Sequence, residues 1–456
     1  MRLLLLIFVS SLGALACART GVAETFKDGE TVCFLGDSIS ASGITQTIVS
    51  NYYATRFPDR TVRFVNAGRS GDTAGGSLQR LQDDVIAKHP TTVAIMFGMN
   101  DVNRSSYVAK PGESEQQAQQ RALDAYQKNM KTVVERLKKE ANDPKFVFIT
   151  PSPFDETVVL DRDNNQPGCN DGLARCASIV RELASQHGGS VVDYHGPMTE
   201  LNLNQQKLDP SWTIIGPDRV HPGQPGHLMM AWLFLKSQEV PALVSNVEID
   251  ASGMRVAKND NAEVSSLAMN GDVLTFSILE NSLPFPISKS AAGVLDLLPI
   301  VADLNQELLK ITGLDGEQYE LRIDGSVVGR YSSSELSDGI NLAMNDSTPQ
   351  FKQAQAVATQ NEYRRSKEAQ ACSMVNTRRW LKSRAKVDPD DTDAIQAYYD
   401  NLEVKNDYYA TMTRILLEKW SQYDELLEEA KRHEDDVLTG RKPVSHSYEL
   451  VQVSKP

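Results

Sequence analysis

The chain has 456 residues, of which 41% are hydrophobic and 23% are charged, and its formal net charge at pH 7 is -13. This composition is typical of a globular protein and excludes both a disordered chain and a membrane-spanning one. The length exceeds what a single hydrophobic core organises, so we expect one domain of ordinary size and an accessory region. The negative charge disfavours nucleic acids and anionic membranes as partners and leaves neutral substrates, such as acylated sugars, open.

The first residues predict export from the cytoplasm. A positive charge at Arg2 precedes an apolar run over residues 3–17, as in a secretory signal peptide, and small residues at 21–23 suit a signal peptidase. We therefore expect residues 1–23 to be removed and the mature protein to be periplasmic or extracellular. A lipid anchor on Cys17 is the less favoured alternative, because the residues before it are in a poor order for a lipoprotein signal. No later stretch approaches the roughly 20 apolar residues of a membrane span.

The cysteines that follow the expected cleavage site are Cys33, Cys169, Cys176 and Cys372. Cys33 lies in an apolar run and is expected to be a buried free thiol. An exported protein reaches an oxidising compartment, which permits a short-loop disulfide between Cys169 and Cys176, but the sequence does not decide whether they are bridged. Their spacing is not C-x-x-C and no histidine accompanies them, which argues against zinc.

Short apolar runs alternate with helical patterns through the first half of the chain. Strands are expected at residues 31–35, 62–65, 92–97, 145–150 and 190–193. Helices are expected at residues 44–57, 76–88, 117–140, 172–187 and 226–238. Strands that alternate with helices, each a nearly continuous apolar run, indicate a three-layer α/β/α fold around a parallel sheet. Active sites of such sheets lie at the carboxyl ends of the strands.

Beyond residue 240 the pattern changes to period-two stretches and then to long polar helices. We expect β-hairpins over 247–276 and 319–331, with a helix over 291–311 between them. From Pro349 onward the composition predicts an antiparallel helical hairpin, with one helix to about 386 and a second from Pro389 to about 438. The expected domains after the signal peptide are residues 24–240, a mixed β/α accessory region at 241–345, and a helical hairpin region at 346–456.

The first of four short motifs is Gly36-Asp37-Ser38, which directly follows the first expected strand and precedes a helix. A serine there can project into a cleft at the sheet edge, with backbone N–H groups nearby that favour negative charge. The same tripeptide forms ordinary turns, so alone it does not identify a nucleophile.

Two further motifs follow the second and third expected strands. Gly71, in Asn66-Ala-Gly-Arg-Ser-Gly71-Asp-Thr73, has no side chain to keep a substrate oxygen away from its backbone N–H. Asn100, in Gly98-Met-Asn100-Asp101, carries an amide that can donate a hydrogen bond to an oxyanion. Each motif alone is equally a turn that caps a helix.

The fourth motif is Asp218-Arg-Val-His221-Pro222, in a loop before the helix expected at 226–238. A carboxylate and an imidazole three residues apart can meet within one turn, so Asp218 can orient the ring while His221 accepts a serine proton. A lone loop histidine is more often a surface residue. His227 lies close by, but it belongs to a helical segment and no acid precedes it, so it ranks second.

In this order, the four motifs resemble those of the SGNH hydrolases, also called GDSL esterases and lipases. The resemblance covers about residues 31–238 and implies a flavodoxin-like fold. Carried across residue by residue, it makes Ser38 the nucleophile, His221 the general base and Asp218 the residue that orients the base. The backbone N–H groups of Ser38 and Gly71 and the side-chain amide of Asn100 become the oxyanion donors. The resemblance implies no metal and no organic cofactor, and compact family members lack the long carboxy-terminal half found here.

These features predict an exported serine esterase that acts through an acyl-enzyme on a small-molecule or glycan ester. The lack of a long apolar lid segment favours short acyl groups, and we expect acetyl groups on carbohydrate. A lipase or thioesterase on simple acyl chains is the first alternative. A catalytically silent glycan-binding protein is the second, and the intact Ser38, Asp218 and His221 argue against it.

The expected carboxy-terminal helices carry an aromatic and a basic cluster. The aromatic residues recur at helical spacing, which favours a role in the core of the hairpin over a sugar platform; they are Trp380, Tyr398, Tyr399, Tyr408, Tyr409 and Trp420. The basic residues are interpreted as a solvated face paired with nearby acids; they are Arg364, Arg365, Arg378 and Arg379.

Overall fold

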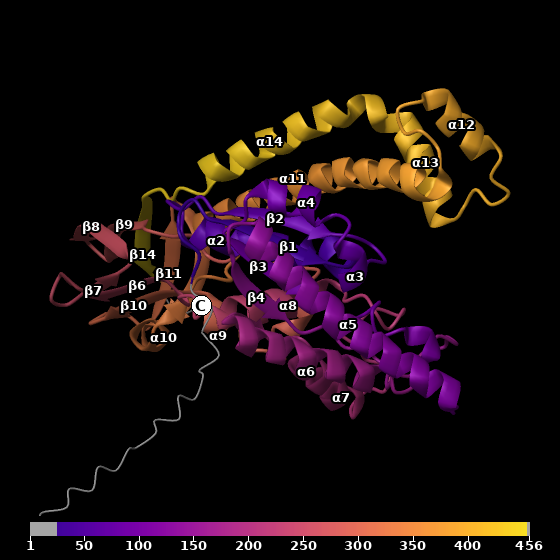
Figure 1. The fold of residues 1–456 in the computed structure, drawn as a ribbon. Coiled ribbons are helices and arrows are strands. Elements are labelled where there is room, and N and C mark those ends of the chain that lie inside the picture. The colour runs from indigo at the N-terminus through magenta and orange to yellow at the C-terminus, as the bar shows by residue number, and fades with distance from the viewer. Residues whose placement is uncertain (1–24, 454–456) are drawn as a thin grey trace, which may run out of the picture.

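The computed structural model describes residues 25–453. The predictions for the signal peptide, residues 1–23, and for Cys17 therefore lie outside the described residues. The described chain forms an α/β domain, two accessory β-sheets and a long helical hairpin (Figure 1). Of the helices that the structure describes, none is long and apolar enough to cross a membrane.

The α/β domain is built on a parallel sheet with the strand order β2-β1-β3-β4-β5. Its strands are β1 (Thr31–Gly36), β2 (Arg63–Gly68), β3 (Thr92–Met96), β4 (Lys145–Ile149) and β5 (Ser190–Val192). Because β1 lies between β2 and β3, the chain segments that follow these three strands leave the sheet side by side.

Helices cover both faces of this sheet, since alternate strand residues are buried on opposite sides. Val32 and Phe34 of β1 belong to one core, and Cys33 and Leu35 belong to the other. The helices of the first core are α2 (Ile44–Arg56), α7 (His195–Gln206) and α8 (Gln224–Ser237). Those of the second core include α5 (Glu113–Glu140) and α6 (Cys169–His187). The predicted three-layer α/β/α fold is confirmed.

Two helices of this domain differ from the prediction. The helix expected at 76–88 is broken into α4 (Leu81–Asp84) and the 3-10 turn η1 (Ile86–Lys88), after a first turn α3 (Ala74–Ser77). The two glycines at 75 and 76 weaken a continuous helix. Helix α7 was not predicted, because its sequence contains glycine, proline and asparagine and lacks an apolar stripe.

The accessory region forms two further sheets. The first has the order β13-β10-β6-β7 and the second has the order β12-β11-β14-β9-β8. Their strands are β6 (Leu243–Asp250), β7 (Arg255–Asp260), β8 (Ala262–Asn270), β9 (Val273–Glu280), β10 (Gln306–Thr312), β11 (Gln318–Ile323), β12 (Ser326–Ser332), β13 (Ile340–Asn341) and β14 (His446–Gln452). The helix expected at 291–311 is wrong over its last third, where β10 alternates buried and half-buried residues as a strand does. Only α9 (Ile300–Leu304) and a 3-10 turn precede it.

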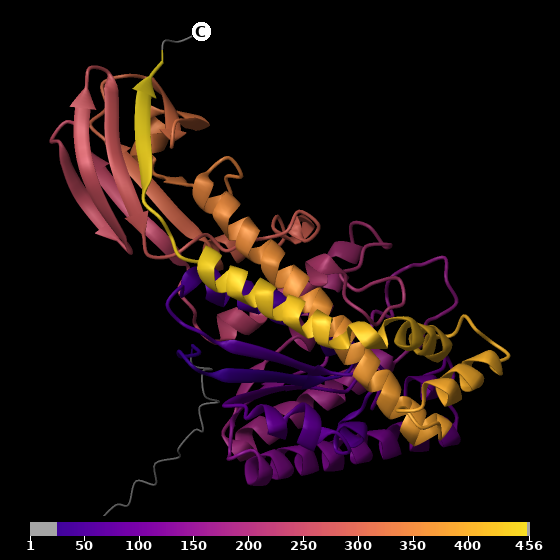
Figure 2. The ribbon, with the colours of Figure 1, turned by 90° about the horizontal axis from the view of Figure 1, so that it is seen from above.

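The helical hairpin differs from the prediction in its second half. Its first helix, α11 (Pro349–Trp380), continues into one π-helical turn and packs along α14 (Tyr423–Gly440) (Figures 1 and 2). The single second helix is wrong, because α12 (Thr392–Asp400) and α13 (Tyr408–Lys419) precede α14, each started by an aspartate cap. The segment then ends in β14, which pairs with β9 and β11, so the hairpin leaves the accessory sheet and returns to it.

Cys169 and Cys176 are free thiols, so the disulfide that the sequence left open is not formed. Both lie on α6, two turns apart, which separates them by about 10 Å along the helix axis. A disulfide requires Cα atoms within about 7 Å of each other. Burial raises the pKa of Cys169 to about 12. Cys33 is a buried free thiol, as predicted.

A cluster of buried charges joins the α/β domain to the accessory sheets. Glu307 of β10 and Glu280 of β9 are both buried, and buried Arg56 at the end of α2 donates to the Leu304 carbonyl at 2.9 Å. Among the described residues, neither carboxylate oxygen of Glu307 has a hydrogen-bond partner. Burial, reinforced by Glu280, raises the pKa of Glu307 well above its usual value, and Arg56 opposes this only in part.

We predict that Glu307→Gln flattens the loss of stability with rising pH. A raised carboxyl pKa means that the folded chain keeps a proton that the unfolded chain releases. This contribution is therefore complete below the ordinary pKa and is lost as the pH rises toward the folded-state pKa. An amide mimics the neutral form at every pH, which removes a slope of up to about 1.4 kcal/mol per pH unit.

Thermal melts of wild type and Glu307→Gln between about pH 5 and pH 8 check this prediction. The control is Glu263→Gln, because Glu263 is exposed and its substitution removes no buried carboxyl. Parallel melting curves for Glu307→Gln and wild type across this range would contradict the prediction.

Candidate active site

Ser38 and His221 meet at the carboxyl ends of the parallel strands. Ser38 is the first residue of the short helix α1 (Ser38–Ala41), and Asp37 caps that helix by accepting from the N–H of Ile39 at 3.0 Å. Ser38 Oγ lies 2.7 Å from His221 Nε2, and His221 Nδ1 lies 2.5 Å from Asp218 Oδ2. The structure thus brings the three predicted side chains into one hydrogen-bonded row.

The Asp218 carboxylate is built to stay ionised. Its second oxygen, Oδ1, accepts from the backbone N–H groups of Val220 at 3.0 Å and His221 at 2.9 Å. Partial burial raises the pKa of Asp218, but these N–H groups and the imidazole outweigh burial and hold the pKa below its usual range. A carboxylate that is charged at neutral pH can orient the ring and stabilise an imidazolium.

Arg219 holds the loop that carries the imidazole. Its backbone is left-handed, with φ 65°, which is unusual for a residue with a side chain. Its buried Nη1 donates to the carbonyls of Asp155 and Val158, each at 2.9 Å. The N–H of Gly216 closes the loop by donating to the His221 carbonyl at 2.7 Å. The position of the base therefore depends on contacts that lie outside the motif.

The strand register brings the loops of Ser38, Gly71 and Asn100 to the same edge of the sheet. Gly36, the last residue of β1, is in register with the last residues of both β2 and β3. Each candidate residue follows its own strand by only a few positions. The sheet order therefore decides that the nucleophile lies between the two candidate oxyanion loops.

Gly71 and Asn100 each keep a donor for a substrate oxygen. Asn100 Nδ2 donates to the Asp72 carbonyl at 2.9 Å, which ties the two loops together and leaves the second amide N–H for another acceptor. Gly71 has φ 73°, and a Cβ added there would meet nothing within 4 Å. Its N–H donates to no residue that the structure describes. As the first residue of a helix, Ser38 likewise has an N–H without an intrahelical acceptor.

Asp101 fastens the same two loops through their backbones. Its Oδ1 accepts from the N–H of Ala74 at 2.9 Å and its Oδ2 from the N–H of Gly98 at 3.1 Å. Burial raises the pKa of Asp101 to about 7 even though both N–H groups lower it. This side chain therefore fixes the spacing of the candidate oxyanion donors.

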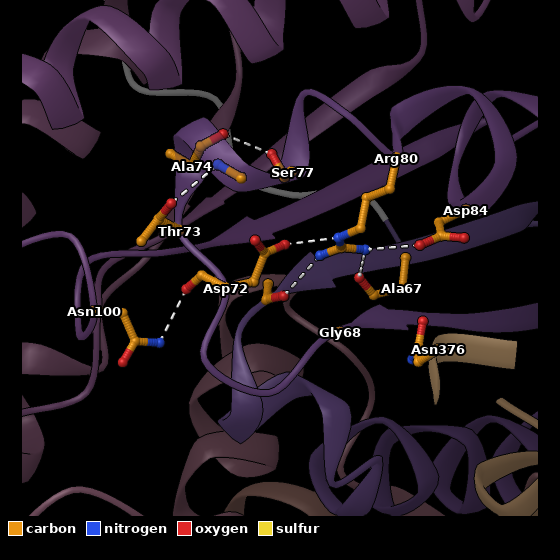
Figure 3. A network of polar contacts seen from close by, with 12 residues as sticks. Ala67, Gly68, Asp72, Thr73, Ala74, Ser77, Arg80, Asp84, Asn100 and Asn376 are labelled. Atoms are coloured by element: carbon orange, nitrogen blue, oxygen red, sulfur yellow. Dashed lines mark hydrogen bonds and ion pairs between the residues drawn. The ribbon is translucent and has the colours of Figure 1, made fainter. Parts of the chain in front are cut away.

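Arg80 connects the strand ends with these loops (Figure 3). Its buried guanidinium pairs through Nε with Asp72 at 2.7 Å and through Nη1 with Asp84 at 3.2 Å. Nη1 donates to the carbonyl of Ala67 at 2.7 Å, and Nη2 donates to the carbonyl of Gly36 at 3.1 Å. One side chain thus grips the ends of β1 and β2 and the loop that follows β2.

The helical hairpin lies against the α/β domain (Figure 2). Arg365 Nη1 donates to the carbonyl of Ser42 at 2.5 Å, and Arg379 Nη1 pairs with Asp84 at 2.6 Å. The predicted solvated face is wrong for these two arginines, because they contact the α/β domain. Since Asp84 pairs with both Arg379 and Arg80, a chain of charges runs from α11 to the candidate oxyanion loops.

Sequence analysis missed Arg80, Arg219 and Asp101 as parts of this site. Asp101 and Arg219 lie inside the motifs, next to predicted residues, and that adjacency is the signal that could have found them. Arg80 lies in a segment expected to be a surface helix, where nothing marks a buried charge. The second-choice histidine, His227, is buried in the core, where burial lowers its pKa to about 4 and its Nδ1 lies 2.9 Å from Thr45 Oγ1.

Of the residues that the structure describes, no group of three or more His, Cys, Asp or Glu side chains lies close enough together to hold a metal ion. What the site offers is a serine, a base with its carboxylate, and fixed N–H donors. This arrangement can carry out acyl transfer by nucleophilic attack.

Comparisons with known proteins identify a family and relatives of this chain. A family model described as the GDSL-like lipase/acylhydrolase family matches residues 34–229. A solved structure of a gut microbial diltiazem-metabolizing enzyme is 30% identical, has a TM-score of 0.87, and covers 95% of this chain and 100% of that one. An acetylxylan esterase from Geobacillus stearothermophilus is 26% identical over 223 residues, 46% of this chain and 93% of that enzyme. The similarity to the diltiazem-metabolizing enzyme includes the accessory regions. The similarity to the acetylxylan esterase extends over less than half of the chain.

We predict that Arg80→Lys lowers kcat for an ester by about 100-fold with little change in KM. Lysine keeps the charge but cannot reach two strand carbonyls and two carboxylates at once, so the oxyanion donors lose their position. Steady-state kinetics with a small aryl ester, together with a thermal melt, measure the effect.

Arg136→Lys is the matched control for this change. Like Arg80, Arg136 donates to a carbonyl, that of Leu78 at 2.7 Å, and pairs with a carboxylate, that of Glu140. It contacts no residue of the site. A lower melting temperature for Arg80→Lys with kcat unchanged would show that Arg80 is only structural.

Proposed function

We infer the function from one premise: the chain belongs to the GDSL-like lipase/acylhydrolase family, the SGNH hydrolases, and is a carboxylic ester hydrolase of that type. We propose that it is a serine esterase that removes short acyl groups, in the first place acetyl groups, from carbohydrate. The observation that carries the proposal is the hydrogen-bonded row of Ser38, His221 and Asp218. The similarity to an acetylxylan esterase supports the acetyl and carbohydrate parts of it.

In the proposed mechanism, Ser38 Oγ attacks the ester carbonyl carbon while His221 Nε2 accepts the hydroxyl proton. Asp218 stabilises the imidazolium that forms. The negative charge on the carbonyl oxygen is held by the N–H groups of Ser38 and Gly71 and by the Asn100 amide. His221 gives its proton to the leaving alcohol, and the acyl group stays on Ser38. A water molecule then attacks this acyl-enzyme in the same way and releases the carboxylic acid.

We further propose that the protein acts outside the cytoplasm, because residues 1–23 have the pattern of a signal peptide. The mass of the mature protein recovered from its host tests this. A lipase or thioesterase on longer acyl chains, and a glycan-binding protein without activity, are the alternatives to the esterase.

We predict that the purified mature protein hydrolyses p-nitrophenyl acetate faster than p-nitrophenyl octanoate. Ser38→Ala should lower the acetate rate by at least about 10³-fold, because it removes the nucleophile. Ser178→Ala, at an exposed position of α6, is the matched control. Acetylated xylo-oligosaccharides and diltiazem, itself an acetyl ester, are the next substrates because of the two relatives.

Each alternative gives a different result in this assay. A preference for octanoate would favour the lipase or thioesterase. A folded wild type that does not hydrolyse p-nitrophenyl acetate and does not react at Ser38 with a fluorophosphonate would contradict the esterase function and favour the binding protein.

We predict that Asn100→Ala costs about 3 kcal/mol of transition-state stabilisation, or 10²- to 10³-fold in kcat. The amide is aimed at charge that develops only during attack, so KM should change little. Asn204→Ala, at an exposed position of α7, is the control. Equal kcat values for Asn100→Ala and wild type would remove Asn100 from the oxyanion site.

A further inference from the structure

A cavity of about 460 Å³ lies between the α/β domain and the helical hairpin. One wall comes from β2, from the loop after it and from the turn between α1 and α2. The other wall comes from α11 and α14, with the start of α13 at its far end. The hairpin therefore completes a space that the α/β domain alone leaves open.

The cavity has a fixed shape, because α11 is fastened on both sides of it. On one side Arg365 donates to the Ser42 carbonyl at 2.5 Å, and on the other Arg379 pairs with Asp84 at 2.6 Å. The residues of α11 that line the cavity, within 364–380, lie along the stretch between these fastenings. A preformed cavity binds a ligand without the loss of conformational entropy that ordering its walls would require.

The cavity is basic although the protein is acidic. Five basic and two acidic side chains line it, whereas the whole chain has a net charge of -13. Arg364 and Arg365 have acidic partners on α11 itself. The other three, Arg63, Arg69 and Lys88, form no ion pair or side-chain hydrogen bond with any residue from 25 to 453. The charge of Arg63 acts on Glu368 of the same lining, whereas Arg69 and Lys88 pair with neither acid of that lining. An excess of cations around one cavity attracts an anionic ligand.

Aromatic side chains form the far end of the cavity. Trp380, Tyr408 and Tyr409 line it, and the rings of Trp380 and Tyr409 stack with centroids 4.3 Å apart. The predicted core role fits Trp380, Trp420 and Tyr398, which pack against the core of the hairpin. It does not fit Tyr408, which is 56% exposed. Exposed aromatic faces are suited to the apolar faces of sugar rings.

Residues that line the cavity are neighbours in the chain of residues of the candidate active site. Arg69 and Ser70, which line it, immediately precede Gly71. Ala41, another lining residue, ends the helical turn that Ser38 begins. A substrate whose ester carbonyl lies at Ser38 can therefore extend its alcohol part into the cavity.

We propose that this cavity binds the alcohol part of the ester as a sugar residue of an anionic glycan. Carboxylates or sulfates on successive sugars pair with Arg69, which follows the end of β2, and with Arg63 and Lys88 farther along the cavity, and one ring packs on the aromatic end. This inference rests on the proposed esterase function and narrows it from neutral acylated sugars to acidic ones.

Calorimetric titration of the wild type with trigalacturonate and with neutral xylotriose tests the proposal. We expect trigalacturonate to bind at least about tenfold more tightly, with a preference that shrinks as salt is added. Arg63→Gln/Lys88→Gln should weaken trigalacturonate binding at least about tenfold. The control is Arg121→Gln/Lys128→Gln, at exposed positions of α5, which should bind like the wild type.

Equal binding of the two ligands, no binding of trigalacturonate, or unchanged binding by Arg63→Gln/Lys88→Gln would overturn the proposal. The titration cleaves no ester bond, so a failure of the esterase function would appear only in the turnover assays. The salt dependence of the wild type tests the proposal independently of whether the double variant folds.

Discussion

The buried ion pair between Arg80 and Asp72 is the contact on which the site depends. The Arg80 side chain is 3% exposed, and its guanidinium donates to the carbonyls of Gly36 and Ala67 at the ends of β1 and β2 while it holds the loop that carries Gly71. A charge so deeply buried is tolerated only where several acceptors surround it. Because those acceptors belong to different strands, the same contacts that keep the charge stable fix the nucleophile turn against the oxyanion loop.

The helical hairpin extends this arrangement beyond the α/β domain. Asp84 accepts from Arg80 (Figure 3) and also from Arg379 of α11, so the hairpin is attached to the same network that positions the loops. Arg365 attaches α11 again at Ser42, close to the nucleophile. The accessory half therefore does two things: it forms one wall of a basic cavity beside the site, and it adds contacts that keep that wall at a fixed distance.

The opposite side of the site is held by different means. Arg219 has a strained left-handed backbone. Two hydrogen bonds from its side chain to carbonyls in the segment after β4 offset the cost of this strain. His221 is consequently presented to Ser38 by a rigid loop. At the far end of the domain, Glu280, Glu307 and Arg56 join the sheets through a buried cluster with two carboxyl groups and one guanidinium. The raised pKa of Glu307 links stability to pH.

The sequence by itself determined the strands of the parallel sheet and the residues of the site, because apolar runs and short motifs are local patterns. Ser38, Gly71, Asn100, Asp218 and His221 were all identified in this way, and the structure places them at one edge. The sequence could not determine Arg80, because its partners come from β1, β2 and the turn at Asp84. For the same reason β10 and β14, whose pairing partners are distant in the chain, were missed. Only the tertiary structure decided which cations of the acidic chain gather around one cavity, since that depends on how α11 packs against β2.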